Sequence, residues 1–196
     1  MKIKKIQEGT LEENGYIIYS KTVGKCWIID PGYKSKTYLN YVRENKLTIK
    51  GILLTHNHYD HIGAVKKIVG ETDCPVYIHV NDMDMYKSEA IAIYDKDTFD
   101  LEGDIIEVIH TPGHTKGSVC FNVKNKKVVF TGDTVFNVDL GRTDLTGGNP
   151  KEMESTIKNI VNTWTNDVEI YPGHGNSCNM KFVKNNNQEF IDIMEK

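Results

Sequence analysis

The residues best suited to do chemistry are concentrated in one hexapeptide, HNHYDH, at positions 56–61. His56 and His58 are two positions apart, so on an extended segment their side chains point the same way and can bind one metal ion. Asp60 and His61 follow at the expected turn into a helix, where the change of chain direction can aim them at a second ion. Four ligand-type residues in six positions favour a metal site over a polar helix start with incidental histidines.

Three later segments each add one further candidate ligand. His114 and His174 both follow a Pro-Gly pair, and Asp133 follows an apolar run that ends at Phe130. In each segment a glycine lets the backbone turn sharply, so that the ligand projects from the end of a strand. Imidazole and carboxylate ligands suit zinc, iron or manganese, and the absence of thiolate ligands disfavours a closed structural zinc site.

The elements that must position these residues can be predicted from periodicity. Helices are expected at 34–46, from 64 to 69 and at 150–164, the last with Asn149 as its cap, and a final amphipathic helix is expected from Phe182 onward. A helix followed by a loop is expected between residues 80 and 100. Strands are expected at 16–19, 26–29, 51–55, 75–78, 105–109, 118–123, 127–130 and 168–171, with a turn at 21–25.

This order of elements predicts an α/β fold of mixed sheets covered by helices. Each candidate ligand follows a strand-like run, which is where such folds gather their chemistry. No repeat or linker-like stretch interrupts the sequence, so a single domain over residues 1–196 is expected.

Composition narrows the class of partner. The 196 residues carry a formal net charge of -3, and a chain without a basic surplus is not expected to bind nucleic acid. No apolar run reaches membrane-spanning length, and the N-terminus is too polar for a signal peptide. The four cysteines form no CxxC pair. A reduced, cytoplasmic enzyme without a membrane partner is expected, and the sequence leaves its oligomeric state open.

Taken together, these motifs resemble the metallo-β-lactamase superfamily, from the first strands to Gly175. The resemblance implies a four-layer αβ/βα sandwich and a site for two divalent metal ions, with zinc expected and iron or manganese as alternatives. It also implies the division of the ligands. The first ion would be held by His56, His58 and His114, the second by Asp60, His61 and His174, with Asp133 bridging the two.

Within this superfamily the sequence is most similar to the glyoxalase II group, the hydroxyacylglutathione hydrolases, in their short single-domain form. The similarity rests on residues 55–63, on Asp133 and on the Gly-His-Gly setting of His174. It implies a hydrolase of a small-molecule thioester, such as S-D-lactoylglutathione, that uses a metal-bridging hydroxide, with Asp60 also orienting the nucleophile. The helical domain that longer members use for glutathione is not expected here, and the loop at 141–145 lacks the expected aromatic residue, so a different thiol carrier is an alternative.

Other activities of the superfamily remain as alternatives. The stretch Gly-Arg-Thr-Asp at 141–144 also resembles persulfide dioxygenases, which use one iron, but the setting of His174 favours a hydrolase. Hydrolysis of another ester or a lactone is a further alternative. Asp133 disfavours a β-lactamase, the charge disfavours a nuclease, and the complete ligand set disfavours a binding module without activity.

Four residues outside the ligand set also carry expectations. The resemblance places Asp30 close to the metals, where it would support a ligand. His110 either orients a ligand or closes a strand, and His79 is expected to be structural. Arg142 is expected to pair with Asp144 rather than to anchor an anionic substrate.

Overall fold

Two six-stranded mixed sheets face each other in the computed structural model, which describes residues 1–21 and 24–196. The first sheet has the order β1-β2-β3-β4-β5-β6, antiparallel from β1 to β3 and parallel from β3 to β6. Its strands are β1 (Lys2–Glu8), β2 (Glu13–Tyr19), β3 (Gly24–Ile29), β4 (Leu47–Leu53), β5 (Val76–His79) and β6 (Ile91–Ile93).

The second sheet has the order β12-β11-β10-β9-β8-β7, in which only β10 and β11 pair in parallel. Its strands are β7 (Thr98–Leu101), β8 (Asp104–His110), β9 (Val119–Val123), β10 (Val128–Gly132), β11 (Glu169–Pro172) and β12 (Cys178–Asn179). Strands β8, β10 and β11 therefore run in the same direction, and their carboxyl ends meet at one edge of the sheet.

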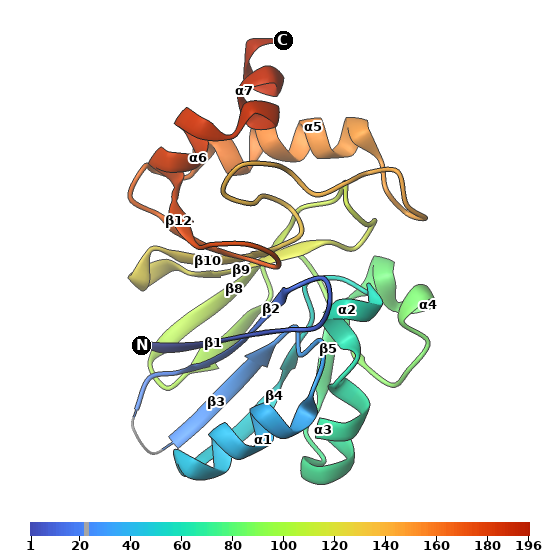
Figure 1. The fold of residues 1–196 in the computed structure, drawn as a ribbon, viewed down its shortest axis with the longest axis vertical. Helices are drawn as coiled ribbons and strands as arrows, with labels where there is room; N and C mark the ends of the chain where they lie inside the picture. Colours follow the sequence, from blue (N-terminus) through green and yellow to red (C-terminus); the bar gives the residue numbers. More distant parts are fainter. Residues whose placement is uncertain (22–23) are drawn as a thin grey trace.

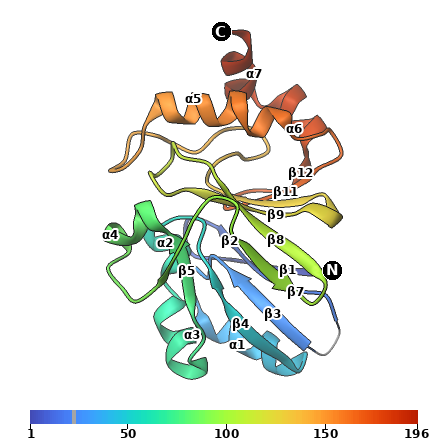
Figure 2. The same ribbon diagram turned by 180° about the vertical axis from the view of Figure 1, so that it is seen from behind.

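Helices cover the outer face of each sheet, as Figures 1 and 2 show from opposite sides. α1 (Ser35–Glu44) and α3 (Val65–Thr72) lie against the first sheet. α5 (Pro150–Asn159) and α6 (Met180–Asn186) lie against the second, and α7 (Gln188–Glu195) packs on α5 and α6, farther from that sheet. The two one-turn helices α2 (Tyr59–Ile62) and α4 (Met83–Tyr86) lie beside the first sheet. The predicted four-layer αβ/βα sandwich is confirmed.

Three buried clusters fill the spaces between these four layers. Alternate residues of β2 belong to different clusters, as the period of two in a strand requires. Ile17 packs with α1 and α3, whereas Tyr16 and Ile18 pack between the two sheets, where Phe130 also lies. The third cluster joins the second sheet to α5, α6 and α7.

Several predicted elements needed correction. Residues 80–100, expected to form a helix and then a loop, form the single turn of α4 and the two short strands β6 and β7. Strands β1 and β12 were also missed. β1, β6, β7 and β12 are the outermost strands of their sheets, where half the backbone pairs with no neighbour and an apolar pattern is not required.

Two predicted helices have different bounds. The helix expected at 150–164 ends at Asn159 and gives way to a 3-10 turn, Val161–Thr163, although Asn149 caps its start as predicted. The final helix is two helices, α6 and α7, because Asn187 is extended and its side chain caps α7 at the Phe190 N–H. The turn expected at 21–25 includes residues 22–23, which lie outside the described residues. The described part of the chain contains no helix long and apolar enough to cross a membrane.

Candidate metal centre

The hexapeptide spans the end of a strand and the start of a helix. His56 follows β4, His58 is the residue just before α2, and Asp60 and His61 lie on that single helical turn. His61 is fully buried, and His56 and Asp60 are buried as well. The remaining candidates follow the parallel-running strands of the second sheet: His114 after β8, Asp133 after β10 and His174 after β11.

The structure brings these seven residues together as two groups of three around one aspartate. In the first group, ligand atoms of His56, His58 and His114 all lie within 4.8 Å of one another. The Nε2 atom of His114 is 2.9 Å from Nδ1 of His58.

The second group is equally compact. Asp60, His61 and His174 offer ligand atoms within 4.8 Å of one another. The Nε2 atom of His174 is 3.4 Å from both Asp60 Oδ2 and His61 Nε2.

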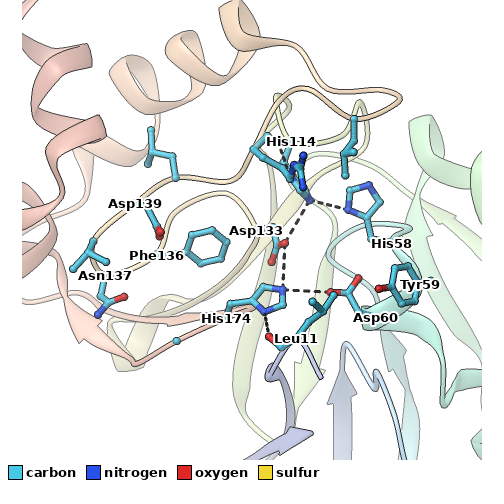
Figure 3. A pocket seen from close by; sticks show the side chains of 15 residues that line it. Leu11, His58, Tyr59, Asp60, His114, Asp133, Phe136, Asn137, Asp139 and His174 are labelled. Carbon is cyan, nitrogen blue, oxygen red and sulfur yellow. Dashed lines mark hydrogen bonds and ion pairs between the residues drawn. The ribbon is translucent and has the colours of Figure 1, made fainter. Parts of the chain in front are cut away.

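Asp133 lies between the two groups, and Figure 3 shows its carboxylate between His114 and His174. Its Oδ1 atom is 3.4 Å from His61 Nε2, and its Oδ2 atom is 3.5 Å from His114 Nε2 and 3.6 Å from His174 Nε2. A Cβ atom at position 173 would collide with Asp133 Oδ1 and with the ring of His61. The glycine of the Pro-Gly-His turn thus leaves the room that this carboxylate occupies.

The second ring nitrogen of four histidines is held from outside the cluster. The Nδ1 atoms of His114 and His174 lie 2.7 Å and 3.0 Å from the carbonyl oxygens of Arg142 and Leu11, to which each must donate a proton. The Nδ1 atom of His61 is 3.1 Å from Asp30 Oδ2, and that of His56 is 3.0 Å from the Thr55 hydroxyl. A proton fixed on Nδ1 leaves the Nε2 lone pair free to bind a metal, which is the usual arrangement of metal-binding histidines.

Burial and neighbouring charges set the protonation of the cluster. Burial, followed by the surrounding histidines, lowers the pKa of His56 well below its ordinary value and also lowers that of His58. Burial by itself would lower the pKa of His61. The carboxylates of Asp133, Asp30 and Asp60 outweigh this effect and raise the pKa to about 9. Burial raises the pKa of Asp60, but a hydrogen bond from His174 and the charge of His61 bring it down to about 2. The Asp60 carboxylate is therefore charged at neutral pH, as a carboxylate that binds a metal must be.

The donor set fits divalent metal ions. Within the cluster, His56 Nε2 and Asp133 Oδ1 are among the buried side-chain atoms of the described residues that make no hydrogen bond. Buried polar atoms normally find partners, so these two atoms indicate a ligand at the centre of the cluster. Nitrogen and carboxylate donors without thiolate suit zinc, iron or manganese.

Asp30 supports this cluster from behind, as expected. It is buried, and its carboxylate accepts hydrogen bonds from the backbone N–H and the hydroxyl of Thr55. Its Oδ2 atom also faces His61 Nδ1 and so holds the orientation of that ring, and an oxygen of Asp30 lies within 4.8 Å of possible ligand atoms of His56 and His61.

Asp82 is a supporting residue that sequence reasoning missed. Its buried carboxylate accepts hydrogen bonds from the Asn57 N–H, the Thr115 hydroxyl and the Gly117 N–H, at 3.1, 2.8 and 2.7 Å. It thereby ties the loop of His56 and His58 to the loop of His114. The sequence around Asp82 contains no motif that indicates this role, because the groups that donate to its carboxylate are distant from it in sequence.

The other predicted residues lie outside the cluster. His110 ends β8 and its Nε2 donates to the carbonyl of Lys116, while its ring stacks on that of His79 at 4.1 Å between centroids. Both expectations for His110 are partly met, since it closes the strand and also fixes the loop that carries His114. Arg142 forms the expected pair with Asp144, through two contacts of 2.7 Å.

Comparison with known proteins places this chain in a family. Residues 9–174 match the family model of the metallo-beta-lactamase superfamily. A probable metallo-hydrolase of Bacillus subtilis is 33% identical over 194 residues, which cover 89% of this chain and 90% of the relative. The chain belongs to the metallo-beta-lactamase superfamily.

More specific similarities point to hydrolytic and metal-binding relatives. A hydroxyacylglutathione hydrolase of Haemophilus influenzae is 29% identical over 95% of this chain and 97% of its own length. The structure of the BLEG-1 B3 metallo-beta-lactamase is 27% identical with a TM-score of 0.90, and the match covers 96% of this chain and 99% of that one. The structure of TTHA1623 in a di-iron-bound form is 29% identical with a TM-score of 0.84, over 94% and 98% of the two chains.

Proposed function

We propose that the protein is a binuclear metallohydrolase that cleaves a thioester such as S-D-lactoylglutathione, with the seven clustered residues as metal ligands. The observation that carries this proposal is the position of Asp133, whose two carboxylate oxygens face histidines of both groups. A single-metal site does not need such a bridge. Similarity to a hydroxyacylglutathione hydrolase supports the choice of a thioester.

The two ions are zinc in this proposal, with iron or manganese as alternatives. The first ion would be held by His56, His58 and His114. The second ion would be held by Asp60, His61 and His174, and Asp133 would contact both ions. When bound, such a pair lowers the pKa of a water molecule and polarises the substrate carbonyl.

The chain's own residues define where the substrate approaches. The buried His56 and His61 form the floor of the site, whereas His58, Asp60, His114, Asp133 and His174 line an open pocket above them. Asp60 is charged and faces this pocket, so its carboxylate can hold the attacking water by a hydrogen bond toward the carbonyl carbon. The leaving group of a thioester is a thiolate, which is stable enough to depart without a proton because thiol pKa values lie near 8.5.

The location proposed for the enzyme is the cytoplasm. All four cysteines, Cys26, Cys74, Cys120 and Cys178, are free. Free thiols without any disulfide are typical of reducing compartments.

The experiment that tests the proposal is hydrolysis of S-D-lactoylglutathione by the zinc-loaded protein and by the variants Asp133→Ala and His58→Ala. Both variants should abolish turnover with little change in the circular-dichroism spectrum, because each removes a ligand. A matched control is Asp167→Asn, which removes an exposed carboxylate paired with Lys127 before the starts of β10 and β11, at the opposite ends of these strands from Asp133 and His174. A near-normal rate in either ligand variant would contradict the proposal.

Two further assays separate the alternatives. Oxygen consumption on glutathione persulfide by protein with one iron per chain would replace the proposal by the dioxygenase activity. Cleavage of nitrocefin in place of the thioester would replace it by β-lactamase activity, the second candidate favoured by the similarity to the BLEG-1 structure.

A further inference from the structure

The pocket above the metal cluster is predominantly apolar away from the ligands. Its volume is about 770 Å³, which is enough for a thioester together with the group that flanks it. Beyond the metal ligands, its apolar lining comes from Leu11, Tyr59, Phe136, Val138, Leu140 and Leu145. Figure 3 shows Leu11, Tyr59 and Phe136 arranged around the opening beside the cluster.

These side chains are unusually exposed for their type. Tyr59 is 65% exposed, Val138 50%, Leu11 49% and Leu145 42%. They come from three separate segments of the chain, yet they share one pocket. Apolar surface gathered in this way around a reactive centre marks a binding site for an apolar group.

The wall that carries Phe136 and Val138 is fixed before any ligand binds. The side-chain amide of Asn187, which is fully buried, donates to the carbonyl oxygens of Phe136 and Asp139 at 3.3 and 2.7 Å. Glu189 accepts from the N–H of Leu140 at 2.7 Å. The C-terminal helices therefore hold this loop in shape, and a preformed apolar wall reduces the entropy lost on binding.

The charges around the pocket do not suit an anionic group. Apart from the ligand histidines, Arg142 is the one cation among the residues that line the pocket. Its guanidinium is already engaged by both oxygens of Asp144, at 2.7 Å each. Asp139 adds a further carboxylate to the lining, and the nearby Lys5 donates to the Gly175 carbonyl at 2.8 Å.

On the basis of the proposed function, we propose that the site cleaves thioesters whose flanking group is apolar and uncharged faster than those of anionic thiols such as glutathione, and that Asp144 disfavours anionic thiols by neutralising Arg142. The reaction is a plain hydrolysis. The oxygen of water bonds to the carbonyl carbon, the C–S bond breaks with its electron pair on sulfur, and the products are a carboxylic acid and a thiol. No oxidant or reductant is needed.

The acyl-chain test uses thioesters of the neutral thiol N-acetylcysteamine with acetyl, butanoyl and hexanoyl groups. Each buried methylene is expected to raise kcat/KM by up to about fourfold. The pocket is open on one side, so we expect a rise of at least about tenfold from acetyl to hexanoyl. Val138→Asp should remove most of this rise, because it places a charge in the apolar wall.

The thiol test compares hexanoyl-N-acetylcysteamine with hexanoylglutathione, which share an acyl group and differ in thiol charge. We expect the neutral thioester to have the higher kcat/KM by about tenfold. Asp144→Asn should raise the ratio of kcat/KM for the glutathione thioester to that for the neutral one by about three- to tenfold, because it frees Arg142. Both partners of this pair are exposed, so the fold should tolerate the change.

The matched control is Asp167→Asn, which frees Lys127 in another exposed pair and should leave the ratio unchanged. Preference for hexanoylglutathione in the wild type, or a ratio that Asp144→Asn leaves unchanged, would overturn the inference while the proposed function stands. Failure of the zinc-loaded protein to cleave any of these thioesters, S-D-lactoylglutathione included, would overturn the proposed function and this inference with it.

Discussion

At the scale of single residues, the candidate centre depends on which ring nitrogen of each histidine is free. Backbone carbonyls fix the proton of His114 and His174 on Nδ1, while Asp30 faces Nδ1 of His61. These partners were beyond the reach of the sequence, except for Asp30. The ligand candidates themselves could be predicted, because close spacing in the hexapeptide and repeated Pro-Gly-His turns are local features.

Replacing Asp30 by asparagine should weaken metal binding without removing a ligand. The amide cannot accept from His61 Nδ1 with the strength of a carboxylate, so the ring loses its fixed orientation. We expect a 10- to 100-fold loss of zinc affinity, measured by competition with a chromophoric chelator. Unchanged affinity would show that Asp30 plays no part in orienting the ligand.

His79 should make the stability of the fold sensitive to pH. Burial, then the neighbouring His110, lowers the pKa of His79 to about 4, against about 6.5 in an unfolded chain. Between these values the unfolded chain binds a proton that the folded one does not. This contribution to the free energy of unfolding is therefore present above about pH 6.5 and is lost as the pH falls toward 4.

The test is the melting temperature of the wild type and of His79→Gln between pH 7.5 and 5. The melting temperature of the wild type should fall further over this range than that of the variant. Both proteins carry the same proposed metal ligands, so the titration of these ligands affects both melting temperatures alike and drops out when one is subtracted from the other. Parallel profiles would contradict the assignment.

At the scale of elements, the centre is assembled where strand ends from both sheets meet. β4 delivers the hexapeptide, and β8, β10 and β11 deliver the other three ligands. Continuous apolar strands and the capped helix α5 could be predicted, since their signals are local. The outer strands β1, β6, β7 and β12 could not, because pairing with a neighbour distant in sequence creates them.

Asp82 makes a testable connection between two of these loops. Asp82→Asn replaces one of the two accepting oxygens by an NH2 group, which then faces the N–H of either Asn57 or Gly117, because these two groups donate to different oxygens of the carboxylate. An unsatisfied buried donor costs about 1–3 kcal/mol, which lowers the melting temperature by several degrees in a chain of this size. We also expect thioester hydrolysis to fall, because the loops of His58 and His114 are no longer held together. Normal stability and activity in this variant would show that the two loops are positioned by other contacts.

At the scale of the whole molecule, the metal ions should stabilise the fold. The proposed ligands come from segments between residues 56 and 174, so an ion bound to them would join both sheets. Binding to the folded state alone adds about 2.7 kcal/mol per site when free metal is at 100 times its Kd. Removal of metal by a chelator should therefore lower the melting temperature by about 5–10 °C per site, and zinc should restore it. An unchanged melting temperature after verified metal removal would contradict a site that links the sheets.

The central claim, a two-metal thioester hydrolase, is tested most directly by titrating the metal-free protein with zinc while following cleavage of S-D-lactoylglutathione and hexanoyl-N-acetylcysteamine. The account predicts that the rate rises with added zinc and reaches its maximum at two equivalents per chain. A maximum at one equivalent, or no cleavage of either thioester at any zinc concentration, would contradict it.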